Sequence, residues 1–373
     1  MLRDQQEALA RGDRAAYVAT WLHDRSGSRQ QAEATYANIT ALGLTDVQLR
    51  LLPGGVDTVA PTPSRSTQSR ASTASVRLVS SLDRGSSQQR YDLTYTFADD
   101  GAETRIQSIE VAAVGREPTW LQGRLTVIRT PRLMVVGHDK HTVASLSRQL
   151  TKARRDVRAV IGSWPRRLLL VAPRNLRQWE RGLGVWPGQY DDVAAVTTTV
   201  DGAIGSEAPV MIVLNPEILP RLPDLGLSLV LAHEIVHAAT GAVTVDTAAW
   251  IVEGFAEYVA FQAVPLPVRI SAGPALREVR HHGLPDQLPT DVDFATPQTQ
   301  IVAYAQSWVL CRTIAHQYGE RALVDFYEAM LRKPDRLGAS LRSVLGTTEH
   351  RLTQRWSVEL QRLSSLRSTS AER

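Results

Sequence analysis

The spacing of the hydrophobic residues changes along this 373-residue chain, and each change restricts the fold. Residues 4–23 and 28–43 carry apolar side chains at helical spacing, which predicts two opening helices. Four stretches with period-two alternation follow and indicate strands. Turn residues such as "DRGSS" and "ADDG" separate these stretches, so the sequence predicts an antiparallel meander after the two helices. The four strand stretches are 47–52, 74–82, 89–97 and 104–114.

A segment within this region, residues 53–75, has a different composition. Its sequence, "PGGVDTVAPTPSRSTQSRASTAS", is rich in Pro, Ser, Thr and Arg. Few large apolar groups are available there to offset the entropy lost on ordering. We therefore expect a mobile loop.

A second part of the chain begins near residue 124. A strand at 124–137 precedes a long helical pattern, and the apolar run "RRLLLVAP" and two further strands, 193–200 and 210–215, come next. After "PDLGLSLVLAHEIVH" the pattern is helix and loop only. The prediction is an α+β protein with four segments: an α+β domain at 1–115, a β-rich first part of a second domain at 124–220, a helical part at 221–363 and a tail at 364–373.

Composition excludes several classes of function. The chain is 43% hydrophobic, which suffices for a sizeable core, and its length favours two domains. The net charge is +4, but the arginines are scattered, so no nucleic-acid partner is predicted. No apolar run reaches the roughly 18 residues of a membrane span. The lone Cys311 lies in an apolar run and is expected to be a buried structural thiol.

The amino terminus, "MLRDQQEALARGD", lacks the apolar core of a signal peptide. If the chain is complete as given, this indicates a cytoplasmic protein. A start directly inside a helix is also what remains after an upstream signal or membrane anchor has been removed. Both locations therefore stay open.

One helical stretch carries candidate metal ligands and a candidate general base. It is "LAHEIVHAATGAVTVDTAAWIVEGFAEY", residues 231–258. His233 and His237 stand four apart, the spacing at which two imidazoles on one helix face can hold one metal ion. Glu234 follows His233 and would lie beside the metal without binding it, as a general base acting on water does. A histidine pair satisfied by hydrogen bonds alone is the structural alternative.

A zinc site built on two histidines needs a third protein ligand. The metzincin class would place a histidine at position 243 and a glycine at position 240, where this chain has Val243 and Thr240. Glu253 and Glu257 lie on an apolar-framed helical segment, again four apart. One of them can bind the metal while the other accepts the free N–H of a ligating histidine.

"HEIVH" followed by "WIVEGFAEY" resembles the gluzincin zinc metallopeptidases, in particular the peptidase MA-like branch with its W-x-x-E-G-F-A motif. The resemblance covers about residues 130–345 and implies a thermolysin-like catalytic domain that hydrolyses peptide bonds. It implies one Zn²⁺ per chain, bound by His233, His237 and Glu253. It also implies that Glu234 is the catalytic base and that Glu257 supports a ligating histidine.

In that family a tyrosine on a later helix hydrogen-bonds the developing oxyanion, and the matching residue here is Tyr304. A core aromatic on that helix is the structural alternative. A neutral phenol suits the catalytic role, because it donates to an oxyanion without ionising at pH 7.

The aminopeptidase branch carries an upstream G-x-M-E-N-type strand, and "VMIVLNPEI" offers no equivalent. This departure favours an endopeptidase. The segment 210–215, interpreted as an edge strand, would pair with an extended substrate.

The opening helices and meander resemble the cystatin-like or NTF2-like fold. Together with the catalytic motif they resemble actinobacterial envelope proteins, which by analogy implies an extracytoplasmic or membrane-anchored location.

Two hypotheses about function result. The first is a zinc metallopeptidase acting on a peptide or protein substrate. The second is a non-catalytic, zinc-stabilised binding or scaffold protein of the cell envelope. A purely structural site has no use for Glu234 and is usually closed by a fourth ligand, which favours the first. His281 and His282 are expected in a polar solvated loop, and residues 177–192 in a glycine- and aromatic-rich loop.

Overall fold

The computed structural model describes residues 1–23, 27–59, 71–82, 88–99, 103–111, 115–164, 166–203 and 208–365. The chain divides into two compact units. One comprises Met1–Arg148 with Arg167–Arg221, and the other comprises Gln149–Arg166 with Leu222–Arg373. The domain limits expected from the sequence, 1–115, 124–220, 221–363 and 364–373, remain predictions. Among the described helices, none combines the length and the apolar character that crossing a bilayer requires.

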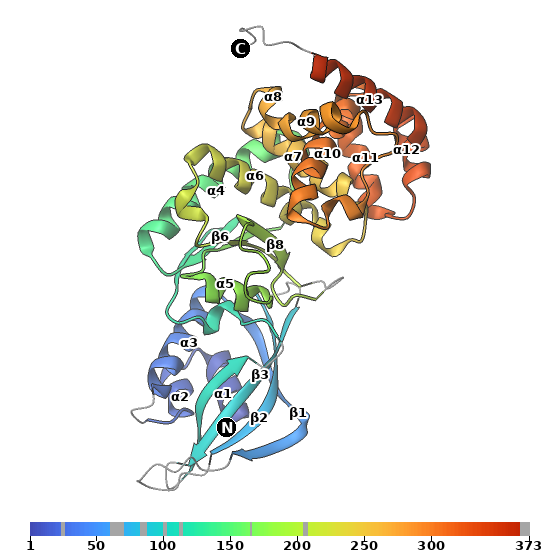
Figure 1. Ribbon diagram of the computed structural model, residues 1–373. Helices are drawn as coiled ribbons and strands as arrows, with labels where there is room; N and C mark the ends of the chain where they lie inside the picture. Colours follow the sequence, from blue (N-terminus) through green and yellow to red (C-terminus); the bar gives the residue numbers. More distant parts are fainter. Residues whose placement is uncertain are drawn as a thin grey trace. The chain divides into compact units, whose positions relative to one another are not determined.

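The first unit opens with three helices that lie against a four-stranded antiparallel sheet in the order β1-β2-β3-β4 (Figure 1). Alternate residues of β3 are buried, as expected for a sheet with one face on a core. The elements are α1 (Leu2–Arg11), α2 (Arg14–Ala19), α3 (Ser28–Leu42), β1 (Thr45–Val59), β2 (Ala71–Ser81), β3 (Gln88–Asp99) and β4 (Thr104–Val111).

The helix predicted over 4–23 is wrong as a single element, because the chain turns between α1 and α2. Gly12 ends α1 with φ 68°, a left-handed conformation that glycine adopts without strain. Asp13 then begins α2, since its side chain accepts a hydrogen bond from the Ala16 N–H at 2.9 Å. Apolar periodicity continues through this turn and hides it.

The loop predicted over 53–75 is wrong at both ends of the segment. Val56 to Val59 pair with Ala74 to Ala71, so both ends of the segment are strand. β2 is also paired with β3 as far as Ala71 opposite Ala98. Main-chain hydrogen bonds to a neighbouring strand therefore extend the sheet into a segment that has few apolar side chains. Residues 60–70 lie outside the described part of the chain.

A second sheet in the same unit has the order β5-β6-β7-β9-β8. β6, β7 and β9 are mutually parallel and wholly buried, and their continuous apolar runs are typical of inner strands covered on both faces. The elements are β5 (Thr126–Arg129), β6 (Leu133–Gly137), α4 (Lys140–Ile161), β7 (Leu168–Val171), α5 (Leu176–Leu183), β8 (Ala195–Thr199) and β9 (Val210–Leu214). The helix α4 continues into the second unit.

Three predictions for this region are wrong. The strand predicted over 124–137 is a hairpin, because the chain turns between β5 and β6. The loop predicted over 177–192 contains most of α5, whose Trp179 is fully buried. The segment 210–215 is not an edge strand, since β9 lies between β7 and β8 and β8 forms the edge. Strand order depends on crossovers, which the pattern along the chain does not reveal.

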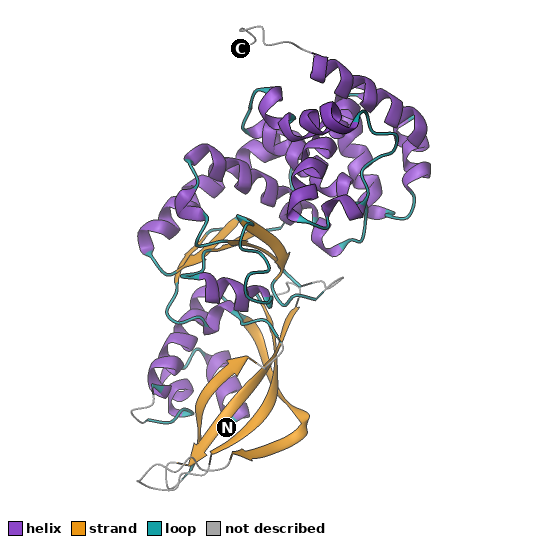
Figure 2. Ribbon diagram, in the orientation of Figure 1, coloured by secondary structure: helices purple, strands orange, loops and turns teal. Residues whose placement is uncertain are grey.

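The rest of the described chain is helix and loop, as predicted from the sequence (Figure 2). The protein is thus a mixed α+β protein with an antiparallel sheet and a mainly helical carboxyl-terminal half. The helices after β9 are α6 (Asp224–Thr240), α7 (Ala249–Ala263), α8 (Val268–Ser271), α9 (Gly273–His282), α10 (Pro297–Tyr318), α11 (Glu320–Arg332), α12 (Leu337–Leu345) and α13 (Glu349–Ser365), with a 3₁₀ turn η4 (Asp291–Phe294) before α10.

Candidate metal centre

Helices α6 and α7 bring the predicted metal ligands together within the second unit. His233 and His237 stand one turn apart on α6, and Glu253 stands on α7. The ligand atoms of the three residues all lie within 4.8 Å of one another. Glu253 follows His237 by 16 residues and His233 by 20, yet the three side chains form one compact cluster.

The closest atoms of this cluster form a triangle. The His233 Nε2 lies 2.9 Å from the His237 Nε2 and 3.1 Å from the Glu253 Oε2, and the His237 Nε2 lies 3.4 Å from that same oxygen. Zinc bound tetrahedrally at 2.0–2.1 Å keeps its ligand atoms about 3.3–3.4 Å apart. The triangle is therefore close in size and composition to three corners of a zinc tetrahedron, and it leaves the fourth corner for water or substrate.

Hydrogen bonding within the chain does not account fully for these histidines. Two nitrogen atoms face each other at 2.9 Å, where at most one proton can lie between them. The His237 Nδ1 is buried and has no hydrogen-bond partner among the described residues. A cation shared by the two Nε2 atoms and the carboxylate would resolve this arrangement, so the donor set fits a metal ion.

Glu257 takes a different position from Glu253, although both stand on α7. Its Oε1 lies 3.4 Å from the His233 Nδ1, on the ring edge opposite the triangle. A carboxylate at that place accepts the Nδ1 proton and leaves the Nε2 lone pair available for a metal. The geometry thus separates two glutamates that the spacing alone left interchangeable.

The charges in the cluster are tightly coupled. Burial by itself would raise the pKa of Glu253, but the charges and hydrogen bonds of His237 and His233 outweigh it and hold the pKa well below its usual range. Burial would likewise lower the pKa of His233, whereas its hydrogen bonds to Glu253 and Glu257 raise the pKa well above the ordinary value. A positive charge is therefore strongly favoured between these carboxylates.

Tyr304 approaches the cluster from α10. Its ring centroid lies 6.0 Å from that of His233, and its hydroxyl receives a hydrogen bond of 3.4 Å from the Gln300 Nε2. Burial raises the pKa of Tyr304 far above 10, and the nearby charges of Glu253 and Glu234 raise it further. The phenol is held neutral, as a hydrogen-bond donor must be.

Glu234 is buried on α6. It directly follows His233 in the sequence, and its charge is one of the causes that raise the pKa of Tyr304. The structure thus brings five predicted residues into contact, His233, His237, Glu253, Glu257 and Tyr304, and it places Glu234 on the helix that carries both histidines.

Gly254 was not singled out from the sequence, yet it controls how closely α7 and α10 pack. A Cβ added at Gly254 would lie 2.6 Å from the Ser307 carbonyl oxygen and 2.8 Å from its carbonyl carbon. The helices therefore touch backbone to backbone, one residue after Glu253 and three residues after Tyr304. A glycine inside an apolar helix is the sequence signal for such an approach.

The other candidates lie in different surroundings. His281 and His282 end helix α9, so the loop predicted for them is wrong, and His282 pairs with Glu278 one turn earlier at 2.8 Å. Ala275 and Leu276 of this helix are buried. Cys311 is buried on α10 as predicted, and burial raises the pKa of its thiol, which disfavours a nucleophilic role.

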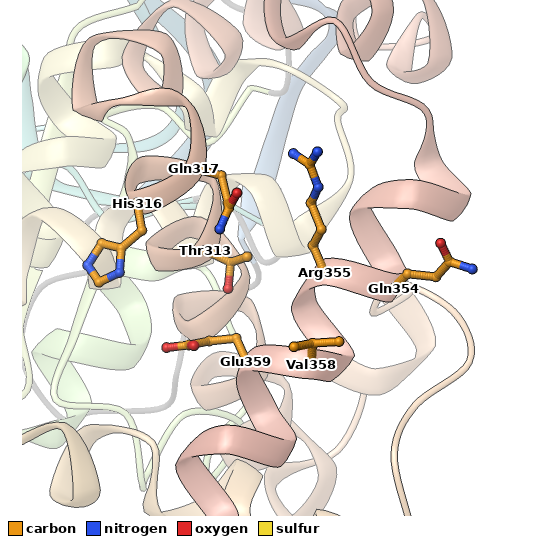
Figure 3. Close-up of a pocket in the computed structure, with 7 residues that line it drawn as sticks. All are labelled: Thr313, His316, Gln317, Gln354, Arg355, Val358 and Glu359. Carbon is orange, nitrogen blue, oxygen red and sulfur yellow. The ribbon is translucent and has the colours of Figure 1, made fainter.

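A separate hollow of about 250 Å³ lies between α10 and α13 (Figure 3). Its charged wall is already paired, since Glu359 accepts hydrogen bonds from Arg312 at 2.6 Å and from Arg362 at 2.7 Å. His316, in its lining, stands twelve residues after Tyr304 on the same helix, which corresponds to about 18 Å along the axis. This hollow is distinct from the histidine cluster.

Comparison with known proteins gives distant likenesses only. No protein-family model matches the chain, and no curated protein matches it. Nineteen chains of solved structures align with it, and three of them are described here. A mutant of a two-domain M1 zinc metallopeptidase bound to L-arginine shows 13% identity and a TM-score of 0.37, over 85% of this chain and 61% of that one.

The second is a mutant of an M1 zinc metallopeptidase from Deinococcus radiodurans bound to a Tyr-Ser-Ala substrate, with 13% identity, a TM-score of 0.37 and coverage of 85% and 84%. The third is an M1 zinc metallopeptidase from Deinococcus radiodurans, with 12% identity, a TM-score of 0.33 and coverage of 84% and 60%. This chain spans about three fifths of the first and third neighbours. A likeness of this degree assigns neither a fold nor an activity to it.

Proposed function

We propose that this protein is a zinc-dependent metallopeptidase. The observation that carries the proposal is the triangle formed by the Nε2 atoms of His233 and His237 and the Oε2 atom of Glu253, with sides of 2.9, 3.1 and 3.4 Å. The other support is Glu257 at the His233 Nδ1, Tyr304 beside the His233 ring, and Glu234 next to His233 on α6. Two imidazoles and one carboxylate with an open fourth position are the ligand set of catalytic zinc sites.

When bound, Zn²⁺ supplies a Lewis acid for the scissile carbonyl and lowers the pKa of water. Glu234 takes the proton from the attacking water and passes it to the leaving amine. The neutral hydroxyl of Tyr304 donates a hydrogen bond to the oxygen on which negative charge develops. Glu257 holds the His233 ring in the tautomer that presents its Nε2 lone pair.

The cleavage is proposed to be internal to the substrate chain. The absence of a G-x-M-E-N-type segment supports an endopeptidase, while the inner position of β9 removes the support expected from strand addition at 210–215. Equal cleavage of a peptide with a free amino terminus and of its N-acetylated form is the expected result. We further propose an NTF2-like type for the opening α+β region, based on its helix and strand order.

Cleavage of a peptide library, followed by mass spectrometry, tests the function. The wild-type chain should cleave, a chelator should stop cleavage, and added Zn²⁺ should restore it. Glu234→Gln should retain zinc but lose hydrolysis, whereas His233→Ala should lose the metal. A protein that binds stoichiometric zinc but cleaves nothing would instead be the zinc-stabilised scaffold.

A further inference from the structure

One tryptophan of this chain differs from the other seven in its surroundings. Those seven side chains are buried, whereas Trp186 is 83% exposed in the segment between α5 and β8. A buried tryptophan removes roughly 150–250 Å² from water, and Trp186 contributes almost none of this to folding. Its position therefore needs an explanation other than packing within the chain.

The exposure does not result from a detached segment, because the chain is anchored on both sides of Trp186. Val185 and Tyr190 are partly buried and pack against the hydrophobic core of the first unit. Asn215, which follows β9, is fully buried, and its side-chain amide donates to the carbonyl oxygens of Tyr190 at 3.3 Å and Val193 at 3.0 Å. The segment is thus fixed to the core and to the end of β9.

Trp186 begins a tight turn whose shape follows from its sequence. The Gln189 N–H donates to the Trp186 carbonyl oxygen at 3.1 Å, and Pro187 and Gly188 occupy the two central positions. Gly188 has φ 84°, as the third residue of a type II turn requires. The Gly188 N–H also donates to the Glu180 carboxylate of α5 at 3.1 Å. A constrained backbone therefore holds the indole in solvent.

Acidic side chains accompany the exposed ring. The Asp191 carboxylate reaches back over the turn, since its Oδ2 would lie 3.7 Å from a Cβ placed at Gly188. Asp192, beside it, is also exposed. Within the described part of the chain neither carboxylate has an ion-pair or hydrogen-bond partner, and residues 184–194 include no lysine or arginine. The turn thus presents an aromatic face next to unpaired negative charge.

From this arrangement we propose that Trp186 and Asp191 form a docking surface for a cationic segment of another protein. One Lys or Arg side chain of that segment lies over the indole face and pairs with the carboxylate. Among aromatic side chains, tryptophan attracts a cation most strongly. The adjacent carboxylates add charge complementarity and repel phosphate-bearing partners such as nucleic acids and anionic membranes. The inference is independent of the proposed function.

Binding of a nona-arginine peptide, measured by calorimetry, tests the proposal. The peptide is built from D-residues, so that a peptidase does not cleave it. Cellohexaose, a neutral sugar chain that also stacks on indole rings, is the second probe. The variants are Trp186→Leu, which keeps an apolar side chain but removes the aromatic face, and Asp191→Asn. Glu110→Gln is the matched control, since this exposed carboxylate lies on β4.

The wild type should bind the peptide in a saturable manner, and binding should weaken as the salt concentration rises. The dissociation constant should increase about tenfold in Trp186→Leu and in Asp191→Asn, and it should not change in Glu110→Gln. Bound peptide should also protect part of the tryptophan emission of the wild type from quenching by acrylamide, because Trp186 is the exposed tryptophan.

A wild-type chain without saturable binding of the peptide would overturn the proposal. Unchanged affinity in Trp186→Leu or in Asp191→Asn would do the same, as would an equal loss in Glu110→Gln, since the peptide would then bind negative charge in general. Binding of cellohexaose without binding of the peptide would assign the surface to a sugar and also contradict it. None of these results bears on zinc binding or peptide cleavage.

Discussion

Replacing Gly254 with alanine should uncouple metal binding from catalysis. The added Cβ would lie 2.6 Å from the Ser307 carbonyl oxygen, whereas ordinary contact begins at 3.4 Å, so the two helices must separate by 3.4 − 2.6 = 0.8 Å. The obstacle is buried backbone, which cannot rotate aside as a long side chain does. Overpacking of this kind costs about 1–3 kcal/mol in the free energy of unfolding.

The separation acts on the site because of where the contact lies. Gly254 directly follows Glu253 on α7, and Ser307 follows Tyr304 by three residues on α10. A misplacement of about 1 Å costs on the order of 100-fold in rate, so kcat should fall about 10- to 100-fold in Gly254→Ala. Zinc content should stay near one per chain, since all three ligands stand on α6 and α7, whereas the added Cβ pushes α7 away from α10.

Thermal unfolding, zinc content and steady-state kinetics on one peptide are the three measurements. Gly338→Ala on α12 is the matched control, because a Cβ there would meet only the far end of the Arg342 side chain at 3.6 Å. That change should stabilise the protein by roughly 0.5–1 kcal/mol, as alanine does in a helix, without changing kcat. Wild-type stability and kcat in Gly254→Ala would refute the reasoning.

Three further changes test other parts of the structure. Tyr304→Phe should retain zinc and lower kcat about 10²–10³-fold, as loss of an oxyanion donor does, and an unchanged kcat would exclude that role. Glu257→Ala should weaken zinc binding about 10- to 100-fold in a chelator competition, while equal affinity would show that its contact with His233 does not orient the ring. Glu359→Gln should lower the free energy of unfolding at pH 7 by about 1–3 kcal/mol, because it removes the carboxylate that accepts hydrogen bonds from Arg362 and Arg312. These hydrogen bonds hold the pKa of Glu359 below 4.5. The stabilisation is therefore present above pH 4.5 and is lost as the pH falls through the folded-state pKa. The melting temperatures of wild type and Glu359→Gln should therefore converge as the pH falls well below 4.5, and a constant difference would contradict the assignment.

The hydrophobic pattern along the chain predicted helix or strand well where burial of apolar side chains decides the element type. The alternation in β3 and the apolar run of β9 both correspond to strands, because burial on one face or on two decides those patterns. The pattern failed where a backbone feature decides. Gly12 interrupts a continuous helical periodicity, and pairing with β2 extends β1 to Val59 through a segment poor in apolar residues.

The candidate site was predictable in composition but not in arrangement. Spacing of four residues places His233 and His237 on one face of a helix whatever surrounds it. Spacing alone could not decide between Glu253 and Glu257. The family resemblance predicted Glu253 as the ligand, and in the structure the two carboxylates contact different nitrogen atoms of the His233 ring. The contact of Phe294 with Tyr304 joins separate elements and depends on how η4 packs on α10.

The central claim is that His233, His237 and Glu253 bind one zinc ion. Elemental analysis of the chain after purification without added metal, together with Glu253→Ala, measures this directly. The structure predicts about one zinc per chain for the wild type and a large loss for the variant, because one corner of the ligand triangle disappears. Less than a tenth of an equivalent in the wild type even after incubation with Zn²⁺, or equal zinc in both proteins, would contradict the account.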